Sequence, residues 1–320
     1  MAEPEPAAPA RESLYSDLTI SPDWSGDKAL AIAGLATAGL VVAILCLSPT
    51  ILPSFRDTDD ATRLEMVREL LGGQGWYDQL IGRLNPPHGV WMHWSRLLDG
   101  GIAGLMLVLR QVMPAIAAEY WTRYVWPLIW IFPAVAAALA LARNLGARSA
   151  AFLAAAVMLV DLNAYRQFVP GRIDHHNLQI TMAVIAMACA TARARRTLWA
   201  MVGAAAAALG LAIGLEAMPL QALIAASYGL MLIRDRAEAP VALRYGLTLA
   251  GASLALFLIQ TPPSRWSLSV CDALGLNLTA AVVVGGVGLA AAGAVSGRLA
   301  ARGRAAIQLS AAAKAGRPSQ

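Results

Sequence analysis

LWAMVGAAAAALGLAIGLEAMPLQALIAASYGLMLI, residues 198–233, contains a single charged side chain, Glu216. Glu216 and the nearby Pro219 divide this stretch into two apolar runs, 198–215 and 217–233. A helix of about 17–25 apolar residues is long enough to cross a hydrocarbon core about 30 Å thick. The pattern therefore predicts two membrane-crossing helices joined by a short hairpin.

Apolar runs of similar length recur along the chain. Six more lie at 29–53, 122–142, 148–163, 177–192, 243–260 and 277–296. Hydrophobic residues make up 58% of the 320 residues, charged residues only 14%, and the mean hydropathy is +0.56. This composition is far from that of a soluble domain. We predict an all-α fold, a polytopic membrane helix bundle of about eight spans over 29–297, flanked by a disordered N-terminal tail (1–28) and a disordered basic C-terminal tail (298–320).

Basic residues gather in the connections that follow every second span. The clusters are Arg143 and Arg148; Arg193, Arg195 and Arg196; Arg234, Arg236 and Arg244; and Arg298, Arg302 and Arg304. Because cytoplasmic loops carry an excess of Lys and Arg, these connections are predicted to face the cytoplasm, which also explains the net charge of +5 without a nucleic-acid partner. The remaining connections lie on the opposite, outer face, at 54–121, 164–176, around 216 and at 261–276. The excess of Arg over Lys and the abundant Ala indicate a bacterial chain, hence an inner-membrane protein whose site faces the periplasm or exterior.

The segment 100–118 is apolar enough to be a further span, but Arg110 and Pro114 interrupt it. Counting it as a span would put the cluster at Arg143 outside the cell and bring Asp174 inside. All the Arg clusters fall on the cytoplasmic side only if this segment does not cross the membrane. We therefore predict a helix that lies in the outer interface or dips into it.

Acidic residues open the first outer loop, in DTDDATRLEMVRELLGG, residues 57–73. Apolar residues at helical spacing predict an amphipathic helix that begins near Asp60. Asp59 would cap this helix and Asp60 would favour its positive end. Asp57 lies upstream of the predicted cap, on the same side of the membrane as Asp174. It is a candidate metal ligand or base.

A second polar group lies in RLNPPHGVWMHWSRLLDG, residues 83–100. Its prolines and glycine predict an irregular turn. His88 and His93 could bind metal, but such residues more often order a long loop through hydrogen bonds, and we favour that interpretation. Arg96 could instead meet a phosphate, because a guanidinium offers paired donors.

GRIDHHNLQI, residues 171–180, places a carboxylate and two imidazoles directly before an apolar run. In an extended segment residues i and i+2 point the same way, so Asp174 and His176 could face one ion while His175 points elsewhere. Gly171 permits an unusual backbone just before them. The alternative is that Asp174 caps the following helix. Three adjacent titratable residues at a membrane boundary, with a second acidic site on the same side, support the two interpretations about equally.

Glu216, in GLEAMP, lies between two apolar runs. At mid-bilayer an ionised side chain costs about 2.5–3.5 kcal/mol on insertion scales. If Pro219 breaks the chain here, Glu216 lies at an outer hairpin and avoids most of that cost. It is then either a functional group near the same cavity or a plain turn residue.

Together these motifs resemble one family. Asp57 followed by Arg63, the loop that ends in HWSRLLDG, and GRIDHHN at the outer end of a later span resemble the N-terminal half of the oligosaccharyltransferase catalytic subunit. That subunit belongs to the GT-C superfamily of multispan glycosyltransferases, and its archaeal branch carries an Asp-His-His stretch in the second outer loop. The resemblance covers about residues 30–235.

The resemblance implies a metal-assisted transfer of a sugar from a polyprenyl phosphate or pyrophosphate. Asp57 would ligate the divalent metal and contact the acceptor, and Asp174 and His176 would be the second-loop ligands. Arg166, one residue out of register with the family's second-loop arginine, would bind substrate. His175 would support the metal ligands without binding the ion itself, and would contact the substrate. Mg²⁺ or Mn²⁺ would stabilise the leaving group, and the histidine ligand favours Mn²⁺.

GLEAMP occupies the place of a short family motif that ends in proline, so Glu216 joins Asp57 as a candidate catalytic residue. The family's Trp-Trp-Asp motif, C-terminal soluble domain and large late outer loop with a catalytic glutamate have no counterpart in this sequence. We therefore expect either a truncated member of a longer family or a GT-C protein with another acceptor, and the acceptor stays open. The competing functions are a non-catalytic fragment or scaffold of such an enzyme, and a transporter or flippase subunit, which the nearly charge-free spans disfavour.

Overall fold

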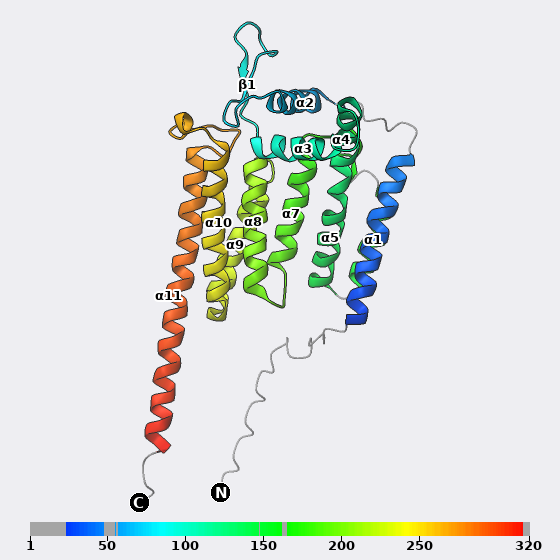
Figure 1. The fold of residues 1–320 in the computed structure, drawn as a ribbon. Helices are drawn as coiled ribbons and strands as arrows, with labels where there is room; N and C mark the ends of the chain where they lie inside the picture. Colours follow the sequence, from blue (N-terminus) through cyan, green and yellow to red (C-terminus); the bar gives the residue numbers. More distant parts are fainter. Residues whose placement is uncertain (1–23, 48–54, 56, 147, 162–164, 316–320) are drawn as a thin grey trace, which may run out of the picture.

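The computed structural model describes residues 24–47, 55, 57–146, 148–161 and 165–315, which are mostly helical. The long helices run side by side as a bundle, and two helices of the first loop lie across one end of it (Figure 1). This arrangement confirms the predicted all-α polytopic membrane helix bundle.

The elements have the following bounds in chain order. The first half of the chain holds α1 (Trp24–Leu47), α2 (Thr58–Leu71), β1 (Leu80–Ile81), β2 (Val90–Trp91), α3 (Arg96–Leu109), α4 (Ala115–Ile129), α5 (Ile131–Leu145) and α6 (Arg148–Val160). The second half holds α7 (His176–Ala190), α8 (Arg196–Ile213), α9 (Met218–Arg234), η3 (Arg236–Glu238), α10 (Ala239–Gln260), η4 (Pro263–Arg265) and α11 (Leu276–Ala315). The strands β1 and β2 pair as one short antiparallel hairpin.

Five segments are long and apolar enough to cross a membrane. They are Lys28–Leu47, Ala115–Leu145, Arg196–Ile213, Arg236–Gln260 and Leu276–Arg302. Three shorter apolar helices pack among them, at Ser149–Val160, His176–Ala190 and Met218–Arg234. Each of the eight predicted spans coincides with one of these segments.

Small residues set the distance between the last two long helices. A Cβ on Gly246 of α10 would lie 2.3 Å from the backbone oxygen of Gly286 on α11. A Cβ on Gly293 would lie 2.8 Å from the backbone oxygen of Ala239. The two backbones therefore pack in direct contact, as small residues allow in helices surrounded by lipid.

Helices α2 and α3 lie across one end of the bundle, which we call the α2–α3 end (Figure 1). Their apolar side chains share a core with the bundle, since Leu64 and Val67 of α2 are buried together with Ile102 of α3 and Leu178 of α7. Most of the segment 100–118 therefore lies across the bundle end, as expected of the predicted interfacial helix, whereas residues 115–118 begin the long apolar segment Ala115–Leu145. The connection between α7 and α8, which carries one of the Arg clusters, lies at the opposite end (Figure 1).

The ends of the chain differ from the prediction. Helix α1 begins at Trp24, inside the predicted tail 1–28, and residues 1–23 lie outside the described residues. Helix α11 continues to Ala315, so most of the predicted disordered tail 298–320 is helical. This part of the sequence is rich in Ala and Arg, which have high helix propensity and allow the last span to continue as one helix. The remainder of that tail lies outside the described residues.

Candidate active site at the α2–α3 end

The connection before α7 turns sharply against the bundle. Gly171 lies there with φ +95°, a left-handed conformation that glycine adopts without strain. Its N–H donates to the backbone oxygen of Arg123 at 2.9 Å. The unusual backbone expected at Gly171 is therefore present, and it precedes a side chain, Asp174, that is only 1% exposed.

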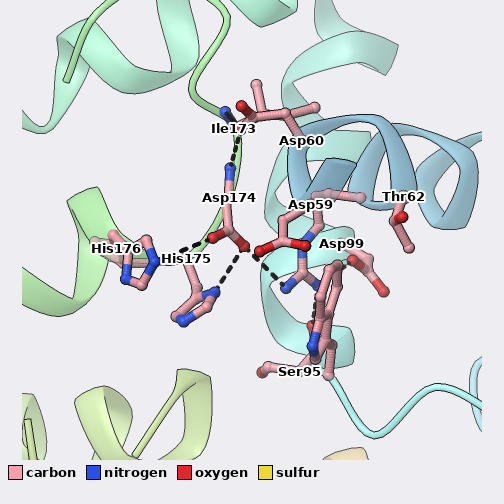
Figure 2. A network of polar contacts seen from close by, with 12 residues as sticks. Asp59, Asp60, Thr62, Ser95, Asp99, Ile173, Asp174, His175 and His176 are labelled. Carbon is pink, nitrogen blue, oxygen red and sulfur yellow. Dashed lines mark hydrogen bonds and ion pairs between the residues drawn. The ribbon is translucent and has the colours of Figure 1, made fainter. Parts of the chain in front are cut away.

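Asp174 lies at the centre of the candidate site (Figure 2). Its Oδ1 lies 2.6 Å from Nδ1 of His175 and 3.8 Å from Nη2 of Arg63. Its Oδ2 lies 3.5 Å from Nε2 of His176, is buried, and accepts no hydrogen bond from the described residues. A buried carboxylate oxygen without a donor has lost the hydrogen bonds that water gave it. The position therefore favours a bound cation.

Asp174 is ionised at neutral pH. Burial acts to raise its pKa, but the hydrogen bond from His175 and the positive charges of His175 and Arg63 outweigh burial and lower the pKa to about 2. Burial acts to lower the pKa of His175, but its hydrogen bonds to Asp174 and Glu216 and the negative charges of these two residues raise it. An ionised carboxylate can bind a metal ion without first releasing a proton.

His175 links Asp174 to Glu216. Its Nε2 lies 2.8 Å from Oε1 of Glu216, whose Oε2 accepts a hydrogen bond from Nε2 of Gln179 at 2.7 Å. Glu216 lies in the turn between α8 and α9, as the predicted hairpin required, and its side chain is 55% exposed. The extended backbone expected here is wrong at His175, where the backbone is helical, so side chains do not alternate there. Both ring nitrogens of His175 face carboxylates, and His176 is the imidazole that lies near Oδ2 of Asp174.

Asp60 of α2 fixes the backbone beside Asp174. Its side chain is fully buried, and its Oδ1 accepts the N–H groups of Ile173 at 3.0 Å and Asp174 at 3.2 Å (Figure 2). Its Oδ2 accepts a hydrogen bond from Arg172 at 3.1 Å. The first and second loops are thus joined at the candidate site by a carboxylate to which the sequence assigned only a favourable place at the helix end.

The N-cap of α2 is Asp57 rather than Asp59. Its Oδ1 accepts the N–H groups of Asp59 and Asp60, each at 3.1 Å, and its Oδ2 binds Arg172. The predicted cap is wrong because the helix begins at Thr58, earlier than the apolar spacing indicated. Burial acts to raise the pKa of Asp57, but the hydrogen bonds from Arg172 and from the backbone of Asp60 lower it. Both oxygens of Asp57 are therefore engaged within the protein.

Three side chains lie close enough together to be considered as ligands of one metal ion. One atom each of Asp174, His175 and His176 lies within 4.8 Å of the other two. Both ring nitrogens of His175 face carboxylates, so Asp174 Oδ2 and His176 Nε2 are the atoms left for an ion. A carboxylate and an imidazole suit Mn²⁺ or Zn²⁺ better than Mg²⁺, which prefers oxygen ligands. The residues present therefore fit a divalent metal.

Arg63, Arg96 and Asp99 form a second buried charged cluster between α2 and α3. Nη1 of Arg63 lies 2.8 Å from Oδ1 of Asp99 and Nη1 of Arg96 lies 3.3 Å from its Oδ2, and all three side chains are fully buried. Arg96 also donates to Oε1 of Gln74 at 2.7 Å and to the backbone oxygen of Trp76 at 2.9 Å. The structure thus favours a role for Arg96 in ordering the loop over the predicted phosphate contact, because its donors are engaged inside the protein.

The arginine that meets the acidic groups is Arg172. Arg166 has an exposed side chain, and it makes no hydrogen bond or ion pair within the part of the chain that the structure describes. Arg172 is 7% exposed and binds Asp57, Asp60 and Oε1 of Gln167. The sequence held a signal for it, since Arg172 lies inside the same GRIDHHN motif as the titratable residues.

A cavity of about 230 Å³ opens beside His175. Its polar lining includes His93, Ser95, Glu216 and Asp272. Glu216 therefore lies where a bound molecule can reach it, whereas Asp174 lies behind His175.

No protein-family model and no curated protein matches the sequence. Among solved structures, the chain is similar to the oligosaccharyltransferase of Archaeoglobus fulgidus in its complex with Zn and sulfate, with a TM-score of 0.57 and 12% identity over 83% of this chain and 35% of that chain. The chain has an oligosaccharyltransferase-like fold. The apo form of the same archaeal protein gives a TM-score of 0.59 at 14% identity over 86% of this chain and 33% of that chain. Its complex with an inhibitory peptide and a dolichol-phosphate gives 0.55 at 13% over 92% and 34%.

The oligosaccharyltransferase-like chain spans about a third of the length of these structures. At this level of identity the similarity shows the fold alone. The archaeal protein has been seen with Zn in one structure and with a dolichol-phosphate in another.

Proposed function

We propose that this protein is a membrane glycosyltransferase that transfers a sugar from a polyprenyl-phosphate-linked donor with the help of a divalent metal, Mn²⁺ or Mg²⁺. The observation that carries the proposal is the buried Oδ2 of Asp174, which has no hydrogen-bond donor and lies 3.5 Å from Nε2 of His176. The fold is oligosaccharyltransferase-like, and Asp174 and His176 lie at the end of its helix bundle. A metal ion, a lipid carrier and its sugar could therefore bind at the same end of the protein.

Asp174 and His176 are the proposed metal ligands. When bound, a divalent cation would neutralise the charge that builds up on the departing phosphate. Asp57 is a further proposed ligand, because its side chain is 42% exposed and its bond to Arg172 can be exchanged for one to an ion. That exchange would free a donor of Arg172, which is then the guanidinium proposed to bind a donor phosphate in place of Arg96 or Arg166.

Glu216 is the proposed base. Its carboxylate lines the cavity beside His175, and the hydrogen bonds from His175 and Gln179 hold it in one orientation. Burial acts to raise its pKa, but the hydrogen bond from His175 lowers it, so Glu216 is ionised and can accept a proton from an acceptor hydroxyl. The acceptor itself stays open.

The reaction would take place at the outer surface of a bacterial inner membrane. The connections that carry the Arg clusters lie at the end of the bundle opposite the site, so the rule that positive loops stay in the cytoplasm puts the α2–α3 end outside. A lipid carrier requires a site that opens at the membrane surface, and the outer end of the bundle meets that requirement.

A second candidate is a non-catalytic fragment or scaffold of such an enzyme. The observation in its favour is that the chain spans about a third of the solved structures that it resembles. A transporter or flippase subunit is a weaker alternative, because the charges described above gather at the end of the bundle rather than along its length.

The decisive experiment measures turnover of a radiolabelled polyprenyl-phosphate hexose by the purified protein in lipid nanodiscs, with and without Mn²⁺. We expect metal-dependent turnover that falls by more than about 100-fold in Asp174→Asn and in His176→Ala, and that persists in His88→Ala. His88 is an exposed histidine of the β1–β2 hairpin and controls for the loss of any imidazole.

Equal turnover in all variants, or turnover independent of metal, would overturn the proposed site. Turnover that appears only when another protein is added would favour the scaffold. Exchange of labelled lipid between the two leaflets without bond cleavage would favour the flippase.

A further inference from the structure

A second cavity, of about 250 Å³, lies beside the first. It is bounded by the β1–β2 hairpin and by the connection between α10 and α11, which is drawn in orange and lies beside the base of that hairpin in Figure 1. The two cavities share His93 and Trp94 as a common wall. A molecule in the second cavity is therefore next to one at His175 and Glu216.

Aromatic rings form the apolar part of this second cavity. Trp91 carries the guanidinium of Arg265 over its ring at 4.1 Å, and Trp94 carries that of Arg63 at 4.6 Å. A cation over one face holds each ring in place, which reduces the conformational entropy lost when a ligand packs against it. Two fixed aromatic surfaces suit a flat apolar face of a small ring.

Two buried amides form the polar part. Gln79 is 6% exposed and Gln260 is 8% exposed, and both line the cavity. Nε2 of Gln79 donates to the backbone oxygen of Trp94 at 2.8 Å, and Oε1 of Gln260 accepts from the hydroxyl of Ser95 at 2.8 Å. Within the described residues no hydrogen bond is made by Oε1 of Gln79 or by Nε2 of Gln260. One free acceptor and one free donor are thus held in a nearly buried position.

We infer that this second cavity binds the sugar ring of the lipid-linked donor. A pyranose has an apolar face of C–H groups that packs on tryptophan, and hydroxyls at its rim that each donate and accept one hydrogen bond. The amides of Gln79 and Gln260 offer both partners, and Arg265 adds further donors. The volume lies below the roughly 300–1,000 Å³ of sites for drug-sized ligands, so it accommodates one ring rather than a chain.

This inference rests on the proposed function for the identity of the donor, but the cavity itself does not depend on it. The phosphate of the donor would lie toward the Asp174 cluster and its sugar toward Trp91 and Gln260. Selection among sugars would then be made by Gln79, Gln260 and Arg265, away from the metal ligands.

The test compares two lipids, polyprenyl phosphate and polyprenyl-phosphate hexose, binding to the purified protein in nanodiscs by titration calorimetry. We expect the wild-type protein to bind the hexose-bearing lipid about tenfold more tightly than the bare lipid. In Gln260→Glu, which keeps the acceptor for Ser95 but removes the free donor, and in Trp91→Ala, we expect that preference to fall to about twofold or less while affinity for the bare lipid stays unchanged. Trp121→Ala, an exposed tryptophan of α4 that lines neither cavity, should keep the preference.

An unchanged preference in both cavity variants would overturn the sugar site, and so would equal losses for the two lipids. A soluble methyl hexoside should compete with the hexose-bearing lipid but not with the bare lipid. If the wild-type protein binds the sugar through Gln260 yet never cleaves the donor, the cavity stands and the proposed transferase reaction fails. If it cleaves the donor but the cavity variants behave as wild type, the reaction stands and the sugar site fails.

Discussion

Two charged clusters lie close together at the α2–α3 end, and they differ in how completely their carboxylate oxygens are paired. In the cluster of Arg63, Arg96 and Asp99, each carboxylate oxygen of Asp99 faces a guanidinium, and every side chain is fully buried. In the cluster of Asp174, His175 and Glu216, one buried oxygen of Asp174 has no hydrogen-bond donor and Glu216 is 55% exposed. A paired carboxylate holds the fold together, whereas an unpaired one leaves a position for a ligand.

Arg63 connects the two clusters. Its Nη1 binds Asp99, and its Nη2 has no hydrogen-bond partner among the described residues but lies 3.8 Å from Oδ1 of Asp174. A positive charge at this distance favours the ionised form of Asp174 and also opposes the binding of a cation beside it. The structural cluster therefore tunes the candidate metal site without occupying it.

The largest effect is expected from Asp99→Ala, which breaks the paired cluster. The substitution removes the carboxylate that faces Arg96 and leaves Arg63 with only Asp174, at 3.8 Å, as a counter-charge. Loss of one partner of a buried ion pair destabilises a protein by about 3–5 kcal/mol. We expect a large fall in the thermal unfolding temperature of the detergent-purified protein, or a loss of folded protein in expression. Asp161→Ala, an exposed carboxylate that follows α6, is the control and should change stability by less than about 0.5 kcal/mol. Equal unfolding temperatures for the two variants would show that the cluster does not stabilise the fold.

A smaller and more specific effect is expected from Asp60→Asn, which weakens the join between the two loops. The amide keeps one acceptor oxygen for the backbone of Ile173 and Asp174 but loses the charge that holds Arg172. Because residues that orient metal ligands typically affect metal affinity by about 10–100-fold, we expect Mn²⁺ binding by titration calorimetry to weaken within that range. Asp235→Asn, an exposed residue between α9 and α10 whose amide keeps the acceptor for the N–H of Ala237, should bind Mn²⁺ as the wild-type protein does. Unchanged affinity in Asp60→Asn would mean that Asp60 has no part in positioning Asp174.

The sequence was sufficient for features that depend on local pattern. Apolar runs of membrane length predicted the helices, and Pro219 next to Glu216 predicted the turn between α8 and α9. Gly171 predicted the left-handed backbone. In each case the physical cause lies within a few residues of the signal, so periodicity, hydropathy and a residue's own conformational limits are enough.

The rest could not be predicted because it depends on contacts between distant segments. Asp60 and Arg172 lie 112 positions apart, and no period in either segment indicates that their side chains meet. The backbone at His175 was expected to be extended but is helical, and the contact of its ring with Glu216, 41 positions away, has no signal in either segment. The cap of α2 was assigned to Asp59 instead of Asp57, because apolar spacing locates the start of a helix only to within a turn. The roles of Asp57, Arg172 and Glu216 in catalysis stay predictions.

The smallest effect is expected from Gly214→Ala. This substitution tests whether donor turnover depends on the exact positions of His175 and Glu216 or only on the presence of these side chains. The backbone at Gly214 is extended, with φ −169°, so alanine is tolerated there without strain. A Cβ would, however, lie 2.7 Å from Oε2 of Glu216, 2.8 Å from Cδ2 of His175 and 3.0 Å from Nε2 of Gln179. Those side chains can shift by a few tenths of an ångström, so we expect folding to be nearly unchanged and donor turnover to fall by only about three- to tenfold.

The control for Gly214→Ala is Gly104→Ala on α3, where a Cβ would meet nothing within 4 Å, and turnover there should stay at the wild-type level. A fall in turnover of Gly214→Ala with unchanged Mn²⁺ affinity would show that Glu216 acts independently of the metal ligands. The ligand pair of Asp174 and His176 would be intact, while the bond from His175 to Glu216 had moved. Parallel losses in Mn²⁺ affinity and turnover would instead mean that Glu216 acts on the metal site through His175. Wild-type turnover would mean that the position of Glu216 does not limit the reaction, and the assignment of Glu216 as the base would then fail.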